Sequence, residues 1–307
     1  MPILNLDLNS SDPKTITLGK RKVIVRERFA QGDICDLYHC TYDDLVTHDA
    51  AGGTRFDRIL EDDGFDTQGV LKVVTSLFDN DLVENEAKTL GHLFPPTAKD
   101  EKFYRYFPRL VESFQIQTGL ETRQANLLTF LEGYLSMADI LAACPKGIDF
   151  RDLVWMFKRT LVGVGFAHQQ GVIHGAMTPA HILVHPVGHG AKIIDWSYAV
   201  QGDNRIRAMS RAYTDFYAPE ILDKKTPKST TDIFMVAKCA VALLGGDVVT
   251  NKMPDGVPKE IQTFLLDCLH PTMSDRPDNA WDLHESFDKL LLKLVGKPTY
   301  RPFALPK

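Results

Sequence analysis

The order of patterns along this chain predicts an α+β fold, with a sheet formed by its first part and helices by its second. Between residues 23 and 131, short segments rich in β-branched and aromatic residues are separated by turn signals. From about Gly133 onward, apolar residues recur at helical spacing instead. Strands followed by helices, rather than a regular alternation of the two, indicate α+β.

Length and composition limit the classes of protein to consider. The chain has 307 residues, 44% apolar and 24% charged, which is enough for one two-lobed unit or two closely packed domains. A net charge of −5 gives no basic footprint, so we expect no nucleic acid partner. No run of eighteen apolar residues occurs, and we expect no membrane span. Five scattered cysteines without a C-x-x-C pair favour reduced thiols and a cytoplasmic location.

The first part of the chain reads as strands with one helix among them. Residues 23–42 predict a hairpin that turns at residues 30–33, and residues 69–74 predict a strand interrupted by Lys72. Residues 81–93 alternate at helical spacing, and residues 107–114 and 125–131 predict two further strands. The polar stretch 43–69 is expected to be a solvated connection rather than a cation site; its acidic cluster is Asp57, Glu61, Asp62, Asp63 and Asp66.

The second part contains helices and one hairpin. Asp149, with Asp152 three residues later, predicts the start of a helix that should end near Gly171. Residues 182–184 and 192–194 predict a hairpin, and the histidines beside its turn, His185 and His189, are expected to be exposed. Residues 229–244 predict a buried helix, because apolar residues occupy most of its faces, with Ser229 or Thr230 as its cap.

Several short runs occur in an informative order. Residues 70–73 read VLKV, residues 174–181 read HGAMTPAH, residues 195–197 read DWS, residues 217–220 read YAPE and residues 275–277 read DRP. In this order they resemble the motifs of the protein kinase family: the V-A-I-K strand, the catalytic loop H-R-D-L-x-x-x-N, the metal-binding D-F-G and the A-P-E run. The chain is therefore similar to protein kinases over about residues 23–295.

The resemblance implies a two-lobed protein-kinase-like fold with a small β-rich N-lobe and a larger helical C-lobe. The expected bounds are an N-terminal extension at 1–22, the N-lobe at 23–132, the C-lobe at 133–295 and a C-terminal tail at 296–307. In such a fold Glu220 is expected to pair with Arg276, and Asp232 to lie buried in the central helix.

The resemblance also implies a site for ATP with magnesium or manganese. Lys72, which could otherwise be an ordinary edge lysine, is expected to pair with Glu86 and to contact phosphates. The hinge is expected at residues 127–133, where Thr129 and Leu131 would offer backbone groups to adenine. Gly32 is the single glycine left of the glycine-rich loop, and Asp195 would hold the metal ion.

The catalytic loop departs from the family pattern at four positions. Ala176 replaces the aspartate that accepts the substrate proton, and Thr178 replaces a lysine near the γ-phosphate. Gly175 replaces the arginine that receives an activation-loop phosphate. His181 replaces a metal-binding asparagine and has two interpretations: a hydrogen-bonded histidine in a rebuilt pocket, or a ligand or acid–base group that acts with Asp195 and favours manganese.

These departures leave two main functional hypotheses. The first is a pseudokinase that can bind ATP and a metal ion and acts through protein partners. The alternative is an atypical ATP-dependent transferase, transferring phosphate to protein or transferring the nucleotide, in which Asp195 and His181 supply the chemistry. A purely structural module is disfavoured, because such a module has no use for Lys72, Glu86 and Asp195 together.

Overall fold

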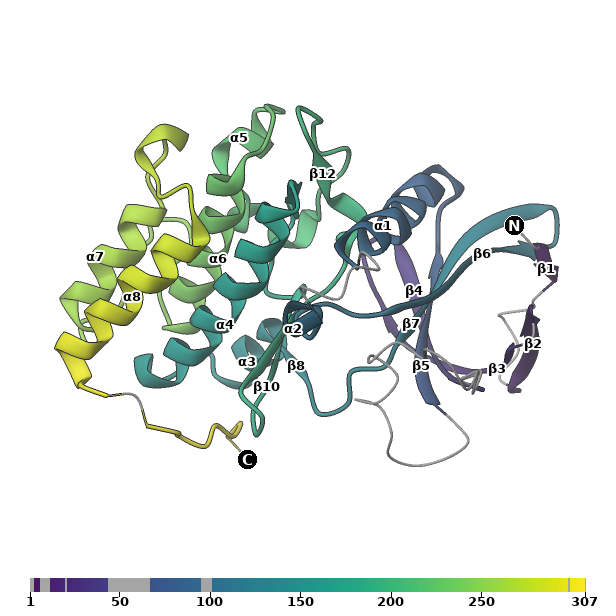
Figure 1. Ribbon diagram of the computed structural model, residues 1–307, viewed down its shortest axis with the longest axis horizontal. Helices are drawn as coiled ribbons and strands as arrows, with labels where there is room; N and C mark the ends of the chain where they lie inside the picture. Colours follow the sequence, from purple (N-terminus) through teal and green to yellow (C-terminus); the bar gives the residue numbers. More distant parts are fainter. Residues whose placement is uncertain are drawn as a thin grey trace. The chain divides into compact units, whose positions relative to one another are not determined.

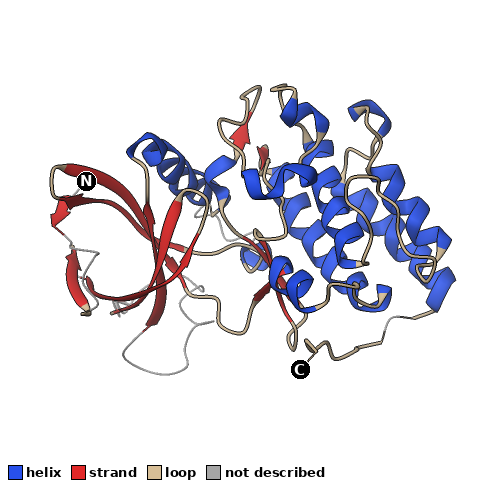
Figure 2. Ribbon diagram, turned by 180° about the vertical axis from the view of Figure 1, so that it is seen from behind, coloured by secondary structure: helices blue, strands red, loops and turns tan. Residues whose placement is uncertain are grey.

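The chain forms two compact units. The computed structural model describes residues 3–5, 12–19, 21–43, 67–94, 101–297 and 299–306. One unit comprises residues 1–101 and 108–131, and the other residues 102–107 and 132–307. Strands dominate the first unit and helices the second (Figure 2), as the α+β prediction requires. The predicted acidic cluster between Asp57 and Asp66 lies outside the described residues.

A seven-stranded sheet forms the first unit. Its strands lie in the order β1-β6-β7-β5-β4-β3-β2, antiparallel except for β1, which runs parallel to β6. The predicted hairpin is β3 and β4, and the strand that contains Lys72 is central in the sheet. The bounds are β1 Ile3–Asn5, β2 Lys14–Leu18, β3 Arg21–Gln31, β4 Cys35–Tyr42, β5 Thr67–Val74, β6 Leu110–Thr118 and β7 Glu121–Thr129.

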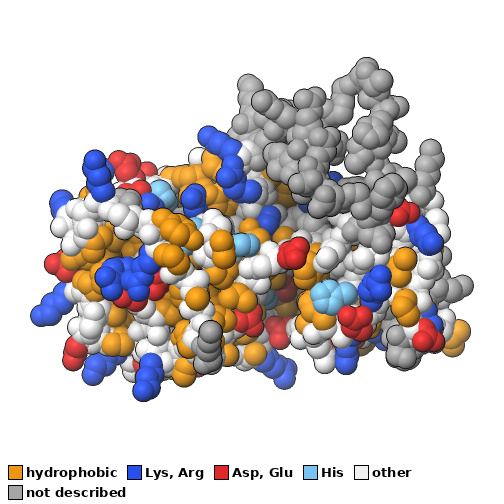
Figure 3. All heavy atoms as spheres, turned by 90° about the horizontal axis from the view of Figure 1, so that it is seen from below, with side chains coloured by type: hydrophobic (Ala, Val, Ile, Leu, Met, Phe, Trp, Pro, Cys, Tyr) orange, Lys and Arg blue, Asp and Glu red, His pale blue; other side chains and the backbone are white. Residues whose placement is uncertain are grey.

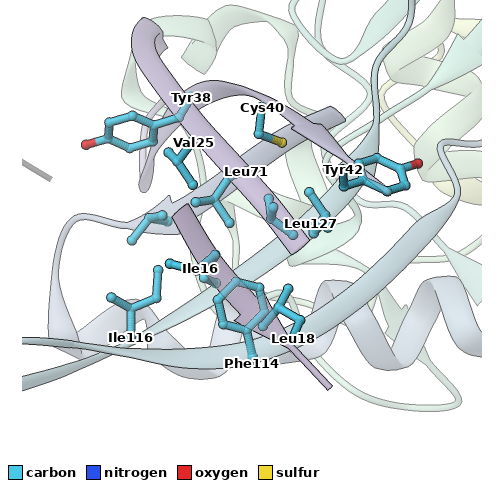
Figure 4. Close-up of a cluster of buried hydrophobic side chains, with 13 residues drawn as sticks. Ile16, Leu18, Val25, Tyr38, Cys40, Tyr42, Leu71, Phe114, Ile116 and Leu127 are labelled. Carbon is cyan, nitrogen blue, oxygen red and sulfur yellow. The ribbon is translucent and has the colours of Figure 1, made fainter. Parts of the chain in front are cut away.

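One cluster of buried apolar side chains in this unit lies on a single face of the sheet. Alternate residues of β3, Val23 and Val25, are buried, because successive side chains of a strand point to opposite faces. They join Leu71, Phe114 and other residues of the neighbouring strands in one cluster of buried side chains (Figure 4). Each such side chain contributes roughly 1.5–3 kcal/mol on full burial, so this cluster fixes the sheet on which Lys72 stands.

One long helix packs on the first unit's sheet. It is α1 (Asn80–Leu93), preceded by the short η2 (Leu77–Asp79), and it confirms the predicted helix at 81–93. Asn80 fastens its start to β7: Nδ2 donates to the Thr122 carbonyl at 3.0 Å, and Oδ1 accepts from the Gln124 amide at 2.7 Å. The helix is thereby held in register with the sheet.

The second unit consists of helices and two small sheets. Figure 1 shows α4, α6, α7 and α8 in it. The sheets have the orders β11-β10-β8 and β12-β9. The bounds are α2 Glu101–Tyr104, β8 Leu135–Ser136, α3 Met137–Ala143, α4 Phe150–Gln169, β9 Val172–Ile173, β10 Ile182–His185, β11 Gly190–Ile193, η4 Trp196–Tyr198, β12 Val200–Gln201, η5 Arg211–Phe216, α5 Pro219–Leu222, α6 Ser229–Leu243, α7 Lys259–Cys268, η6 Met273–Asp275 and α8 Ala280–Val295.

The helix ends agree with the sequence in one case and not in another. Asp149 caps α4 by accepting a hydrogen bond from the Arg151 amide at 2.9 Å, and Gly171, with φ of 72°, follows the end of the helix as predicted. The cap predicted for α6 was wrong. Lys228 is the N-cap, and its own amide donates to Thr231 Oγ1 at 2.9 Å, while Ser229 and Thr230 lie in the first turn.

Residues 299–306, here called the C-terminal strap, return to the β10–β11 hairpin (Figure 1). His189 stacks between Trp155 of α4 and Tyr300 of the strap, with ring centroids 4.2 and 4.6 Å away. Nη1 of Arg301 lies 3.2 Å from Oδ2 of Asp149, and its Nε lies 3.0 Å from Oδ1 of Asp152. The expectation that His189 and His185 are exposed was wrong. Both are half-buried, because His189 lies in this stack and His185 contacts Tyr134.

Candidate functional site

The first unit contains a buried ion pair. Lys72 on β5 is 6% exposed, and its Nζ lies 3.0 Å from Oε1 of Glu86 on α1, which is fully buried. The other carboxylate oxygen, Oε2, accepts from Nδ2 of Asn126 at 3.0 Å, and the same amide donates to the Val83 carbonyl at 2.9 Å. The predicted pair is confirmed. Asn126 was missed, although a lone amide within the apolar run 125–131 is a usable signal.

The other nucleotide-site candidates of the first unit are less distinctive. Gly32 lies exposed in the β3–β4 turn, and its amide donates to the Cys35 carbonyl at 2.8 Å. Thr129 ends β7 and exchanges hydrogen bonds with Arg109, through its amide at 3.1 Å and its hydroxyl at 3.2 Å. Leu131 is the last residue of the unit. Their part in nucleotide binding stays a prediction.

In the second unit, one buried carboxylate holds the start of the loop 174–181. Asp232 of α6 accepts hydrogen bonds from the amides of His174 and Gly175, both at 2.8 Å, and lies 2.9 Å from Nε2 of His168. His174 is itself buried, with Nε2 2.9 Å from the Ile194 carbonyl. Burial lowers the pKa of His174 to about 4, so its ring is neutral near pH 7.

The two substituted positions in the middle of this loop are buried. Ala176 has no exposed side-chain surface, and its carbonyl accepts from the Thr178 amide at 2.7 Å. Thr178 is also buried, and among the described residues its Oγ1 has no hydrogen-bond partner. Neither side chain can accept a proton from a substrate or place a cation beside a phosphate.

His181 and Asp195 lie together. Nδ1 of His181 is 2.8 Å from the Ala176 carbonyl, and its Nε2 is 3.2 Å from Oδ2 of Asp195. A carbonyl oxygen only accepts, so Nδ1 carries a proton. In the neutral ring Nε2 then presents a lone pair towards the carboxylate, whereas in the imidazolium it presents a proton. The arrangement suits either an ion pair or a cation held between the two groups.

Asp195 stands in a strained backbone position. Its φ of 61° and ψ of 62° are left-handed, which is uncommon for a residue other than glycine and costs on the order of 1–3 kcal/mol. The next residue, Trp196, is fully buried against Phe107 and His174, and its Nε1 donates to the Ile193 carbonyl at 2.9 Å. The buried indole therefore anchors the chain immediately after the carboxylate.

The segment that follows is anchored by an apolar contact. Gly175 has a φ of 72°, and a β-carbon there would overlap Cδ1 of Ile206 and lie 2.9 Å from its Cγ1. Ile206 thus packs directly on the backbone of the loop 174–181. The Ser210 amide also donates to the Tyr217 hydroxyl at 2.9 Å. Sequence reasoning noted the loss of the arginine at 175 but missed the isoleucine that fills this place.

The second unit also contains a buried ion pair between Arg276 and Glu220. Arg276 donates from Nη1 and Nη2 to the two carboxylate oxygens of Glu220, at 2.8 and 3.0 Å, and the Thr231 hydroxyl donates to Oε1 at 2.7 Å. The predicted pair is confirmed. Among the described residues, no group of three or more His, Cys, Asp or Glu side chains could hold a metal ion. A metal at Asp195 and His181 would therefore take its remaining ligands from phosphates or water.

A β-rich unit with a buried lysine–glutamate pair and a helical unit with this loop define a two-lobed protein-kinase-like fold. A family model described as "Protein kinase domain" matches residues 121–297. The match covers more than half of the chain, which therefore belongs to the protein kinase domain family. It includes the loop 174–181 and Asp195 but begins after Lys72 and Glu86. Kinase domains generally use ATP with magnesium.

Curated relatives are similar at low identity. The serine/threonine-protein kinase CST20 of Candida albicans is 25% identical over 198 residues, which are 53% of this chain and 16% of the relative. STE20 of Candida glabrata is 23% identical over 51% of this chain and 21% of the relative. PkaB of Streptomyces coelicolor is 28% identical over 44% of this chain and 38% of the relative. The chain thus spans well under half the length of these relatives.

No helix among the described residues is long and apolar enough to cross a membrane. On the face drawn in Figure 3, basic and acidic side chains are interspersed among hydrophobic ones.

Proposed function

We propose that this chain is a cytoplasmic pseudokinase that binds ATP with a divalent metal ion and acts through a protein partner. The observation that carries the proposal is the buried ion pair of Lys72 and Glu86, whose carboxylate also accepts from Asn126, in a chain whose buried Ala176 offers no proton acceptor. A buried ion pair is often no more stabilising than apolar residues of similar volume. Its presence is therefore better explained by ligand binding than by stability.

Each part of a bound ATP molecule and its metal ion can be assigned a residue that would contact it. Lys72 would hold phosphate oxygens, and Asp195 would hold the metal ion, which supplies positive charge at the phosphates. Thr129 and Leu131 would present backbone groups to adenine, and Gly32 would let the β3–β4 turn approach the phosphates. The exposed Gly32 has no neighbouring glycines at positions 30 and 35, so we expect weak binding.

A melting experiment tests this proposal. Millimolar ATP with magnesium or manganese should raise the melting temperature, because a ligand at 100 times its Kd adds about 2.7 kcal/mol to stability. Lys72→Met combined with Glu86→Gln should abolish the shift without leaving a charge buried. Lys22→Met, at an exposed lysine of β3 in the same sheet, is the matched control and should retain the shift. No shift in the unaltered protein would refute nucleotide binding.

A second candidate, an atypical transferase, is favoured by one observation: Nε2 of His181 faces Asp195 at 3.2 Å. Because Nδ1 is committed to the Ala176 carbonyl, Nε2 is the nitrogen left to bind a metal ion or move a proton. Imidazole suits manganese better than magnesium. The names of the relatives suggest serine or threonine as the acceptor if phosphate is transferred.

Intact-mass measurement after incubation with ATP separates the two candidates. A transferase would add mass faster with manganese than with magnesium, and His181→Ala would abolish the addition. Turnover on generic serine or threonine peptides within the ordinary range of ~1–100 s⁻¹ would contradict the pseudokinase proposal. In that event Ala176→Asp with His181→Asn would show whether the ordinary residues increase the rate further.

A further inference from the structure

An exposed basic surface lies on the second unit. Residues 203–228 carry six exposed cations against three exposed carboxylates, in a chain whose net charge is −5. We call these cations the basic surface: Arg205, Arg207, Arg211, Lys224, Lys225 and Lys228. The carboxylates are Asp203, Asp215 and Asp223.

Two segments are brought together to form this surface. The Thr226 hydroxyl donates to the Asp203 carbonyl at 3.4 Å, which joins the loop after α5 to the segment after β12. Ile206 packs on Gly175 between Arg205 and Arg207. The apolar side chain is turned inward and its two neighbours are exposed, so the fold itself presents the arginines.

The surface continues into a pocket of about 600 Å³ at the start of α6. Its lining includes Lys225, Lys228, Thr230, Thr272 and Ser274. Thr230 is 5% exposed, and among the described residues its Oγ1 has no hydrogen-bond partner. The amides of the first turn of α6 add positive potential at this end.

Carboxylates also line the pocket, and two of the three are already paired. Glu220 is held by Arg276, and Asp223 lies 2.8 Å from Lys225. Asp278 is the third. Within the pocket Asp278 offsets Lys228, so the excess of positive charge comes from the basic surface as a whole, whose six exposed cations outnumber its three exposed carboxylates. That excess fits an acidic ligand and disfavours a basic one.

We infer that the basic surface binds a segment of a partner protein rich in aspartate and glutamate, with one acidic side chain seated in the pocket beside Lys228 and Thr230. The inference rests on the proposed function in one respect, that the chain acts through a protein partner. Acidic side chains would form charge-assisted hydrogen bonds with the arginines, and the threonine hydroxyl would gain the partner it lacks.

Fluorescence anisotropy of the full chain with a labelled Asp- and Glu-rich peptide tests the inference. A peptide of the same length with Gln and Asn in place of the acids is the first control, and single-stranded RNA is the second. We expect binding to the acidic peptide alone, weakening as salt is raised. Equal binding of the neutral peptide, or tighter binding of the RNA, would overturn the inference.

Matched variants locate the binding. The triple change Arg205→Ala, Arg207→Ala and Arg211→Ala should weaken the acidic peptide about tenfold. The matched control removes three exposed lysines elsewhere in the same unit and should change affinity less than about twofold; they are Lys259, Lys293 and Lys297. Equal loss in both triple variants would overturn the inference. Unchanged melting temperatures verify that both variants are folded.

The same measurement separates this inference from the proposed function. It is made without nucleotide, and the Lys72→Met/Glu86→Gln variant should bind the peptide as the unaltered protein does. Peptide binding without any ATP-induced melting shift would refute nucleotide binding and leave the basic surface intact. An ATP-induced melting shift without peptide binding would refute the inference about the basic surface and leave nucleotide binding intact. Thr230→Val, which replaces only the hydroxyl group, should weaken binding of the acidic peptide measurably. If the affinity is unchanged, the pocket takes no part in binding the peptide.

Discussion

Replacing Gly175 with alanine should destabilise the second unit by two separable effects. The first is conformational, because alanine at a φ of 72° is left-handed and costs roughly 1–2 kcal/mol. The second is steric, because the new methyl group would overlap Ile206. Overpacking of this kind costs typically ~1–3 kcal/mol. Together they predict a loss of roughly 2–5 kcal/mol, which chemical denaturation resolves.

A double-mutant cycle separates the two effects. In the Ile206→Ala background, Gly175→Ala should cost only the conformational part, roughly 1–2 kcal/mol, because the overlap is gone. Limited proteolysis with trypsin provides a second measurement, because loss of the contact between Ile206 and the loop 174–181 should speed cleavage after Arg205 and Arg207. If Gly175→Ala costs the same in both backgrounds, packing of Ile206 on the loop is not what requires glycine, and the anchoring argument fails.

Three further predictions concern the second unit. Arg276→Met should cost roughly 3–5 kcal/mol by leaving Glu220 buried and unpaired, and adding Glu220→Gln should restore part of this loss in denaturant titrations. His174 has a folded-state pKa of about 4, below its unfolded value, so the unfolded chain binds the extra proton. Stability should therefore fall as pH drops from about 6.5 to about 4, and His174→Gln should flatten that slope. Arg301→Ala should cost roughly 1 kcal/mol, because its two ion pairs are partly exposed, and a loss above ~3 kcal/mol would contradict this view of the strap.

The sequence predicted the elements whose signals are local or fixed by a motif. Lys72 and Glu86 could be paired in advance because Lys72 falls within the run VLKV and Glu86 within the predicted helix at 81–93, and the family pattern pairs a lysine and a glutamate at these places. The α4 cap followed from Asp149, whose side chain acts on its own first turn. Such contacts depend on neighbours in sequence or on a family pattern.

Contacts that depend on packing between distant segments could not be predicted. Ile206 is an ordinary apolar residue in sequence, and only the fold places it on Gly175. His189 sits beside a glycine turn, which suggests exposure, yet Trp155 and Tyr300 enclose it from two other segments. The orientation of His181 was open for a similar reason, because the Ala176 carbonyl decides which nitrogen faces Asp195.

The C-terminal strap has a consequence for how the second unit folds. Arg301 contacts Asp149 and Asp152, so residues about 150 positions apart in the sequence must meet before α4 has all its partners. Contacts of such long sequence separation form late and slow the folding of a domain. During synthesis, α4 and the β10–β11 hairpin leave the ribosome well before the strap does, so the face of His189 that stacks on Tyr300 stays uncovered until Tyr300 has been made. The turn of the hairpin that follows the loop 174–181 therefore gains its contacts with Tyr300 only after the strap has been made.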